Sequence, residues 1–187
     1  MTGEKIGPGR LIAVVGPSGS GKDTLLRAAR THFANEPGIV FPRRAITRPD
    51  GDDNEDHLAL TRDEFAHLKT VGAFALDWEA HGLLYGIPIA IDEDIALGRT
   101  VVVNLSRSVI AAARSRYASC TAVAISIDAA TMRQRLIARG RETGPDIEAR
   151  IARMDFSPPE GFELIIENTG PLKAAVEQFQ AMIIWSM

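Results

Sequence analysis

The chain has 187 residues, of which 45% are apolar and 24% are charged, and its formal net charge is −3. These values are typical of one folded domain with a sizeable core, and they exclude a disordered chain. The acidic balance argues against general nucleic-acid binding, and no apolar run approaches the length of a membrane span.

Residues 1–9 are polar and rich in glycine, without the apolar segment of a signal peptide, so we expect a flexible end. The single cysteine, Cys120, excludes an intramolecular disulfide and is typical of a reducing compartment. It lies beside an apolar run, and we expect its thiol to be inert. We therefore expect a cytoplasmic protein without membrane or nucleic-acid partners. The sequence does not distinguish a monomer from a homodimer.

A glycine-rich segment joins an apolar run at 11–15 to a helix predicted over 23–33. It follows the pattern G-x-x-x-x-G-K, in which backbone N–H groups and a helix start surround a phosphate chain. The predicted nucleotide-binding residues are Gly16, Pro17, Ser18, Gly19, Ser20, Gly21, Lys22, Asp23 and Thr24. Lys22 supplies a cation for the outer phosphates, whereas an ordinary glycine turn is the alternative. Asp23 stands where Ser or Thr usually ligates Mg²⁺, so we expect it to reach the metal through water.

Residues 41–90 contain short strand-like pieces, one helix predicted over 61–70, and many polar or aromatic side chains. We interpret this segment as an insertion that binds a second substrate. Its cluster of Arg43, Arg44 and Arg48 favours a small anionic ligand, because planar guanidinium groups suit phosphate recognition.

Apolar runs at 100–104, 121–127 and 162–166 alternate with helices predicted at 106–117, 129–138 and 171–184. This alternation predicts an α/β fold with a parallel sheet flanked by helices. The ligand should then lie at the carboxyl ends of the strands, beside the glycine-rich segment.

Residues 139–150 combine two glycines, a proline and three arginines. We interpret them as a lid that neutralises charge on a transferring phosphoryl group and excludes water, with a plain surface loop as the alternative. The predicted catalytic residues are Lys22, Arg139, Arg141 and Arg150. There is no Asn-Lys-x-Asp motif of GTPases, and the run at 100–104 ends in Asn104 rather than aspartate. The pattern favours a kinase that acts on a small phosphorylated acceptor.

Several of these segments together resemble the guanylate kinase-like family. They are 16–22, Thr47-Arg48-Pro49, Tyr85-Gly86, the arginine-rich segment 135–150 and Ile165-Ile166-x-Asn168. The resemblance covers about residues 10–170 and implies a P-loop NTPase fold with a nucleotide-monophosphate-kinase-type insertion and an arginine lid. It further implies one domain over 10–187, with a core at 10–40, 91–138 and 151–187, the insertion at 41–90 and the lid at 139–150.

The resemblance also implies roles for individual residues. Arg48 and Tyr85 would bind a phosphate of the acceptor, and Asn168 would lie near the adenine of ATP, unless it is only a strand-end turn residue. The positions that read guanine do not match: a serine, a glutamate and an aspartate align with Arg44, Leu76 and Ser106. Leucine cannot accept a hydrogen bond from a purine, so guanine is not the expected acceptor. The extra cation at Arg44 indicates a second anionic group in its place.

A narrower family, the ribose 1,5-bisphosphate phosphokinases, is similar in this altered pattern. The similar segments are 21–24, 43–49, 56–60, 75–88, 102–107 and 139–142. The resemblance implies phosphorylation of ribose 1,5-bisphosphate by ATP, with Mg²⁺, to give 5-phospho-α-D-ribose 1-diphosphate and ADP. Arg43 or Arg44 would hold the second phosphate, and His57, Trp78 and His81 would line the sugar. The alternatives are a nucleoside monophosphate kinase of non-guanine specificity and a non-catalytic binding module.

Overall fold

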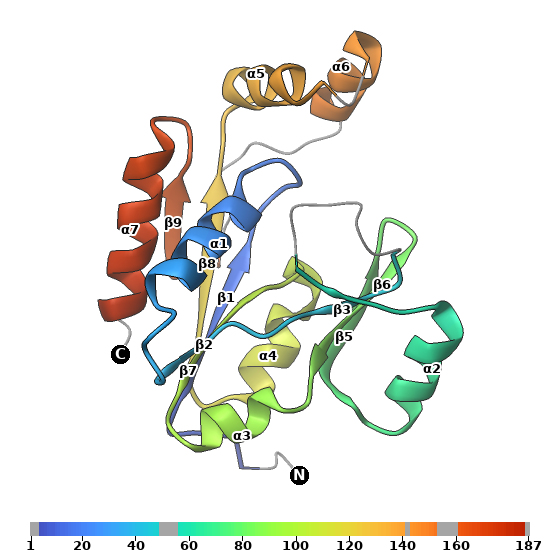
Figure 1. The fold of residues 1–187 in the computed structure, drawn as a ribbon, viewed down its shortest axis with the longest axis vertical. Coiled ribbons are helices and arrows are strands. Elements are labelled where there is room, and N and C mark those ends of the chain that lie inside the picture. Colours follow the sequence, from blue (N-terminus) through green and yellow to red (C-terminus); the bar gives the residue numbers. More distant parts are fainter. Residues whose placement is uncertain (1–3, 49–55, 141–142, 153–160, 186–187) are drawn as a thin grey trace.

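The computed structural model describes residues 4–48, 56–140, 143–152 and 161–185. A parallel sheet with the strand order β2-β7-β1-β8-β9 forms its centre (Figure 1). The strands are β1 (Arg10–Val15), β2 (Ile39–Val40), β7 (Thr100–Asn104), β8 (Cys120–Ser126) and β9 (Leu164–Glu167). Because β1 is the middle strand, the glycine-rich loop that follows it lies at the centre of the carboxyl edge of the sheet.

Helices cover both faces of this sheet (Figure 1). They are α1 (Lys22–His32) and α7 (Leu172–Trp185) on one face, and α3 (Ile91–Ala96) and α4 (Ile110–Arg116) on the other. Ile12 and Val14 of β1 share a buried cluster with Phe179 of α7, whereas Leu11 shares another with Ile91 of α3. Both faces of β1 are therefore buried, which explains why its sequence is continuously apolar.

A second sheet with the strand order β4-β3-β6-β5 lies beside the first (Figure 1). Its elements are β3 (Ala45–Ile46), β4 (Leu58–Ala59), α2 (Arg62–Thr70), β5 (Phe74–Ala80) and β6 (Leu83–Pro88). All of them fall within the segment 41–90 that we predicted as an insertion. Thr61 and Glu64 form a capping box that starts α2. Trp78 of β5 and Ile87 of β6 belong to the buried cluster that contains Leu11, so the second sheet packs on the main core.

Two helices, α5 (Ala129–Arg139) and α6 (Gly144–Ala152), lie above the carboxyl ends of the strands (Figure 1). Leu136 and Ile147 belong to a small buried cluster between them. Arg133 also contacts Glu148 with two hydrogen bonds, of 2.6 and 2.7 Å, and this pairing lowers the pKa of the Glu148 carboxyl. The two helices are thus packed against each other.

The segment 139–150, which we interpreted as a lid, contains most of helix α6, an element that the sequence did not predict. Pro145 is the second residue of this helix. Proline is tolerated in a first turn, because the N–H group that it lacks has no partner within the helix. The Thr143 carbonyl accepts the N–H of Ile147 at 3.0 Å, which continues the helical pattern. The proline therefore marks the start of a helix.

The other predicted elements are largely confirmed. The strands at 11–15, 100–104 and 121–127 correspond to β1, β7 and β8, and the strand predicted from 162 begins at Leu164. The short elements β2 and α3 were not predicted. Among the described residues, no helix is both long enough and apolar enough to cross a membrane.

Two further expectations concern the chain end and the cysteine. Part of the segment 1–9 that we expected to be flexible is hydrogen bonded, because Ile6 N donates to Arg116 O at 2.9 Å and Ile6 O accepts from Ala118 N at 2.8 Å. Burial raises the pKa of the Cys120 thiol to about 11. The thiol is therefore protonated near neutral pH, which agrees with an inert side chain.

Candidate active site

The glycine-rich loop turns tightly between β1 and α1. Gly19 and Gly21 have φ angles of 92° and 90°, a region that side chains with a Cβ atom disfavour. At Gly21 there is also no room, since a Cβ atom would lie 2.3 Å from Asn168 Nδ2. Lys22 begins α1, and its Nζ donates to Pro17 O at 3.3 Å. The ammonium group therefore lies over the loop whose N–H groups would surround a phosphate chain.

Asn168 supports this loop from behind. Its side chain is completely buried, and Nδ2 donates to Ser20 O at 2.7 Å. Arg135 Nη2 donates to Asn168 Oδ1 at 3.3 Å, and burial lowers the pKa of this arginine. We expected Asn168 near the adenine of ATP, and that contact stays a prediction. The structure shows that its side chain holds the backbone of the phosphate loop.

One arginine of the predicted lid reaches the loop. Arg150, in the last turn of α6, donates from Nη2 to Ser18 Oγ at 2.8 Å. Arg141 and the side chain of Arg139 lie outside the described residues. Of the three predicted lid arginines, the structure thus describes the side chain of Arg150 alone, and this side chain lies against the phosphate loop.

A cavity of about 280 Å³, the main cavity, opens in front of the loop. Residues of both predicted binding regions line it: Gly16, Ser18, Gly19, Gly21, Lys22, Asp23, Thr24, Arg44, Arg48, Trp78, Ala80, His81, Tyr85, Asn104, Leu105 and Ser106. A wider space of about 770 Å³ also has Arg48, His81, Tyr85 and Ser106 in its lining, and it extends to Arg150. The fold therefore places the predicted nucleotide loop and most of the predicted acceptor residues around one space.

Arg44 is a buried cation in the lining of the main cavity. It is 7% exposed, and its Nη1 donates to Asn104 O at 3.2 Å. Its guanidinium carbon lies 5.4 Å from the ring centre of Tyr85 and 5.9 Å from that of Trp78. The two rings are stacked, with centres 5.2 Å apart and planes at 5°. Contacts of this kind stabilise a cation at an aromatic surface and fix its direction.

Two predicted acceptor residues lie outside the lining of the main cavity. Arg43 Nε pairs with Asp56 Oδ1 at 2.7 Å, and the Arg43 side chain is 54% exposed. Its Nη2 donates to His57 O at 2.8 Å. His57 is buried, with Nε2 3.5 Å from Arg48 O. The sequence left open whether Arg43 or Arg44 holds the second phosphate. Only Arg44 lines the main cavity, beside Lys22.

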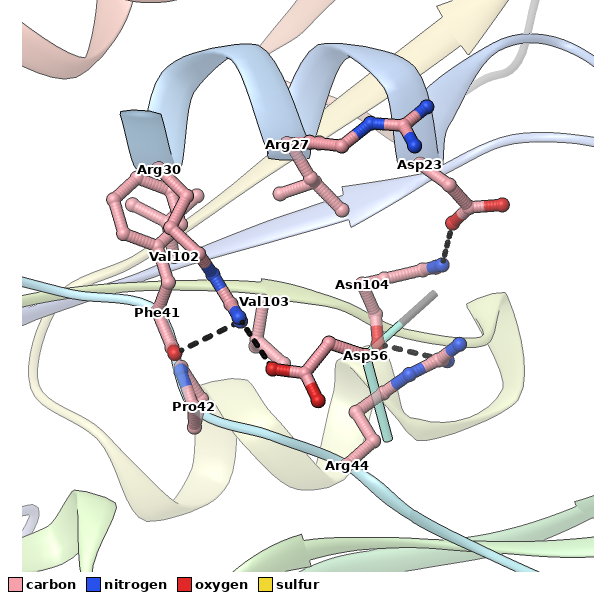
Figure 2. A pocket seen from close by; sticks show the side chains of 11 residues that line it. Asp23, Arg27, Arg30, Phe41, Pro42, Arg44, Asp56, Val102, Val103 and Asn104 are labelled. Atoms are coloured by element: carbon pink, nitrogen blue, oxygen red, sulfur yellow. Dashed lines mark hydrogen bonds and ion pairs between the residues drawn. The ribbon is translucent and has the colours of Figure 1, made fainter. Parts of the chain in front are cut away.

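A smaller side cavity of about 130 Å³ lies between α1 and the segment 41–44 (Figure 2). Its wall toward the main cavity contains Asp23, Arg44 and Asn104, which line both spaces. Asn104 Nδ2 donates to Asp23 Oδ1 at 3.0 Å. The sequence analysis noted Asn104 only as a departure from the usual aspartate and did not include it among the site residues. The sequence signal that could have identified Asn104 as a site residue is its position at the end of an apolar run.

One acidic side chain of the site could take part in binding a magnesium ion. Asp23 is the single carboxylate in the lining of the main cavity, as far as the structure describes the chain. In the described ranges, no three His, Cys, Asp or Glu side chains are grouped so that they could hold a metal. Mg²⁺ typically keeps several waters and binds one or two carboxylates together with substrate phosphates. One carboxylate beside a phosphate loop matches that requirement.

The chain is similar to curated bacterial proteins over most of its length, although no family model matches it. It is 48% identical to the ribose 1,5-bisphosphate phosphokinase PhnN of Rhodopseudomonas palustris over 170 residues, which cover 91% of this chain and 86% of that protein. It is also 48% identical to the protein of the same name from Acidiphilium cryptum over 176 residues, covering 94% and 93% of the two chains.

Solved structures agree on the fold. A guanylate kinase from Anaplasma phagocytophilum superposes with a TM-score of 0.65 at 16% identity, covering 95% of this chain and 85% of that one. A gluconokinase from Sinorhizobium meliloti superposes with a TM-score of 0.50 at 20% identity, covering 97% and 94%. Both agree with the α/β fold described above, and at such low identity they carry no information on the reaction or the substrate.

Proposed function

Because the chain belongs to the ribose 1,5-bisphosphate phosphokinase family, we propose that it transfers the γ-phosphoryl group of ATP to the 1-phosphate of ribose 1,5-bisphosphate. The products are 5-phospho-α-D-ribose 1-diphosphate and ADP. The single observation that best supports this proposal is the cavity in which Lys22 of the phosphate loop faces two acceptor-side arginines, Arg44 and Arg48. An acceptor with two phosphates and no base matches that distribution of charge.

The reaction needs no general base. The nucleophile is an oxygen of a phosphate monoester, whose second pKa is about 6, so it is largely dianionic near neutral pH. It forms a new P–O bond to the γ-phosphorus while the bond from that phosphorus to the β-bridging oxygen breaks, and ADP leaves with the electron pair. The remaining task is to position the two anions and to neutralise their charge.

The residues around the cavity divide this task. Lys22 and Arg150 neutralise the transferring group, and we propose that Arg139 and Arg141 join them from the lid. Asp23 would hold a water of Mg²⁺, and the metal would supply positive charge that screens the ATP phosphates. The contact of Arg150 Nη2 with Ser18 Oγ of the phosphate loop, at 2.8 Å, supports this assignment of Arg150.

On the acceptor side, Arg48 and Tyr85 are assigned to the phosphate that is attacked, and Arg44 to the distal phosphate. Trp78 and His81 border the same space and are assigned to the sugar. His57 lies behind Arg48, with Nε2 3.5 Å from the Arg48 carbonyl oxygen, so we assign it to positioning that segment. A guanidinium group can donate two hydrogen bonds to one phosphate, so these arginines favour a phosphate over a neutral base.

The proposal is tested by the release of ADP from ATP with a panel of acceptors at equal concentration. We expect turnover with ribose 1,5-bisphosphate, and a kcat/KM about 10- to 100-fold lower with GMP, AMP or ribose 5-phosphate, because a lost charged contact costs ~1.5–3 kcal/mol. Efficient phosphorylation of a nucleoside monophosphate, with little turnover of the sugar bisphosphate, would instead support the alternative of a nucleoside monophosphate kinase.

A further inference from the structure

A hydrogen-bonded chain of three residues forms the wall that the two cavities share (Figure 2). Arg44 Nη1 donates to the backbone carbonyl of Asn104 at 3.2 Å, and the side-chain amide of Asn104 donates to Asp23 Oδ1 at 3.0 Å. Asn104 thus lies between the acidic residue of the phosphate loop region and the buried cation of the acceptor side. Its two contacts use different groups, the carbonyl toward Arg44 and the amide toward Asp23.

The sheet fixes the position of Asn104. It is the last residue of β7, its Cα is in register with that of Val14 in β1, and it is 8% exposed. Asp23, by contrast, lies in the first turn of α1, where its side chain is half-buried at the edge of the main cavity. The end of β7, which the sheet fixes, therefore holds one oxygen of the Asp23 carboxylate, a group that is less buried than Asn104. Figure 2 shows the second oxygen of Asp23 pointing away from Asn104.

We infer that Asn104 is a positioning residue for phosphoryl transfer, whose side-chain amide fixes Asp23 in the orientation that holds the Mg²⁺·ATP complex. The inference rests on the proposed function for its kinase chemistry, but it concerns the donor side alone. Since Arg44 contacts the carbonyl of Asn104 and not the amide, the side chain of Asn104 acts on Asp23 and leaves the acceptor contacts in place.

The chemistry explains why a neutral amide suits this position. An aspartate at 104 would place two carboxylates within hydrogen-bond distance, and like charges at that distance favour protonation of one of them. Asn104 supplies an N–H donor without a second negative charge, and one oxygen of Asp23 is left for the cavity. The pair thus provides one fixed anionic group where the phosphate loop meets the strand end.

The test compares Asn104→Leu, which has a similar size and no donor, with the wild type. Binding of ATP is titrated calorimetrically with Mg²⁺ present and with the metal removed by EDTA, in the absence of any acceptor. We expect the affinity for ATP to fall about tenfold with Mg²⁺, the loss typical of a positioning contact near a metal, and to remain unchanged without it. In turnover, kcat should fall. The KM for the acceptor should stay within about twofold, because the residues that contact the acceptor are unchanged.

Two further variants keep the inference falsifiable. Thr100→Val changes another buried polar residue of β7, at the opposite end of the strand, and should leave the effect of Mg²⁺ on ATP binding unchanged. Asp23→Ala should show the same Mg²⁺-specific loss, and adding Asn104→Leu to it should have no further effect, because the two residues then act as one unit.

An equal loss of ATP affinity with and without Mg²⁺ in Asn104→Leu, or additive effects in the double variant, would overturn the inference. If Asn104→Leu does not fold, an equal loss of ATP affinity with and without Mg²⁺ in Asp23→Ala would overturn the inference. All of these binding measurements omit the acceptor. They are therefore independent of whether ribose 1,5-bisphosphate is the substrate, and a failure of the proposed function would appear only in the acceptor panel.

Discussion

Lys22→Ala should lower kcat by about 10³-fold, since removal of one preorganised group that stabilises transition-state charge typically costs 10²–10³-fold and Lys22 carries a full charge. The ammonium group lies at the start of α1, with Nζ 3.3 Å from Pro17 O, and it borders the main cavity. No other lysine lines that cavity among the described residues, so no neighbouring ammonium group can replace it.

The measurement is steady-state ADP release, combined with thermal unfolding of both proteins. Lys22 is only half-buried and outside the hydrophobic clusters, so we expect the melting temperature to change by no more than a few degrees. Lys22→Arg keeps the charge with a different shape and should retain part of the activity. A folded Lys22→Ala protein with turnover within tenfold of the wild type would contradict the assignment of Lys22 to the phosphates.

The second large effect is expected at Arg44. Arg44→Met should lower kcat/KM for ribose 1,5-bisphosphate by about 10²-fold, because a charge-assisted phosphate contact is worth ~3 kcal/mol. Methionine fills part of the volume beside Trp78 and Tyr85 while it removes the charge. The KM for ATP should change little, because Arg44 lies on the acceptor side of the cavity.

The neighbouring residue provides a matched control. Arg43 has the same side chain, but it is half-exposed and paired with Asp56 outside the lining of the main cavity. Arg43→Met should therefore change kcat/KM by less than about threefold, as expected for an exposed ion pair worth ~0–1 kcal/mol. Equal losses in the two variants, or a larger loss at Arg43, would show that the distal phosphate binds elsewhere.

The sequence predicted the parallel sheet and the phosphate loop because their signals are local. The continuous apolar runs of β1, β7 and β8 follow from burial of both faces of each strand, and the glycines at 19 and 21 are required by left-handed backbone angles. In contrast, β2 spans only Ile39–Val40, which is too short for any periodicity to appear.

The parts of the candidate site that the sequence did not predict depend on contacts between distant segments. Arg43 and Arg44 are adjacent in the chain, and only the pairing of β3 with β4 and β6 decides which of them faces the cavity. The bond between Asn104 and Asp23 requires β7 to lie next to β1, an order that no local pattern encodes. The hydrogen bond from Asn168 to Ser20 O, which the sequence did not predict, also joins two segments far apart in the chain.

The proposed reaction is tested most directly by the identity of its product. Phosphorus NMR of a completed reaction with ATP and ribose 1,5-bisphosphate distinguishes a diphosphate on carbon 1 from a third phosphomonoester on the sugar. The account predicts a new pair of coupled diphosphate resonances, an unchanged 5-phosphate monoester signal and one ADP for each diphosphate formed. A new phosphomonoester on a ribose hydroxyl, or ADP release without any new sugar phosphate, would contradict it.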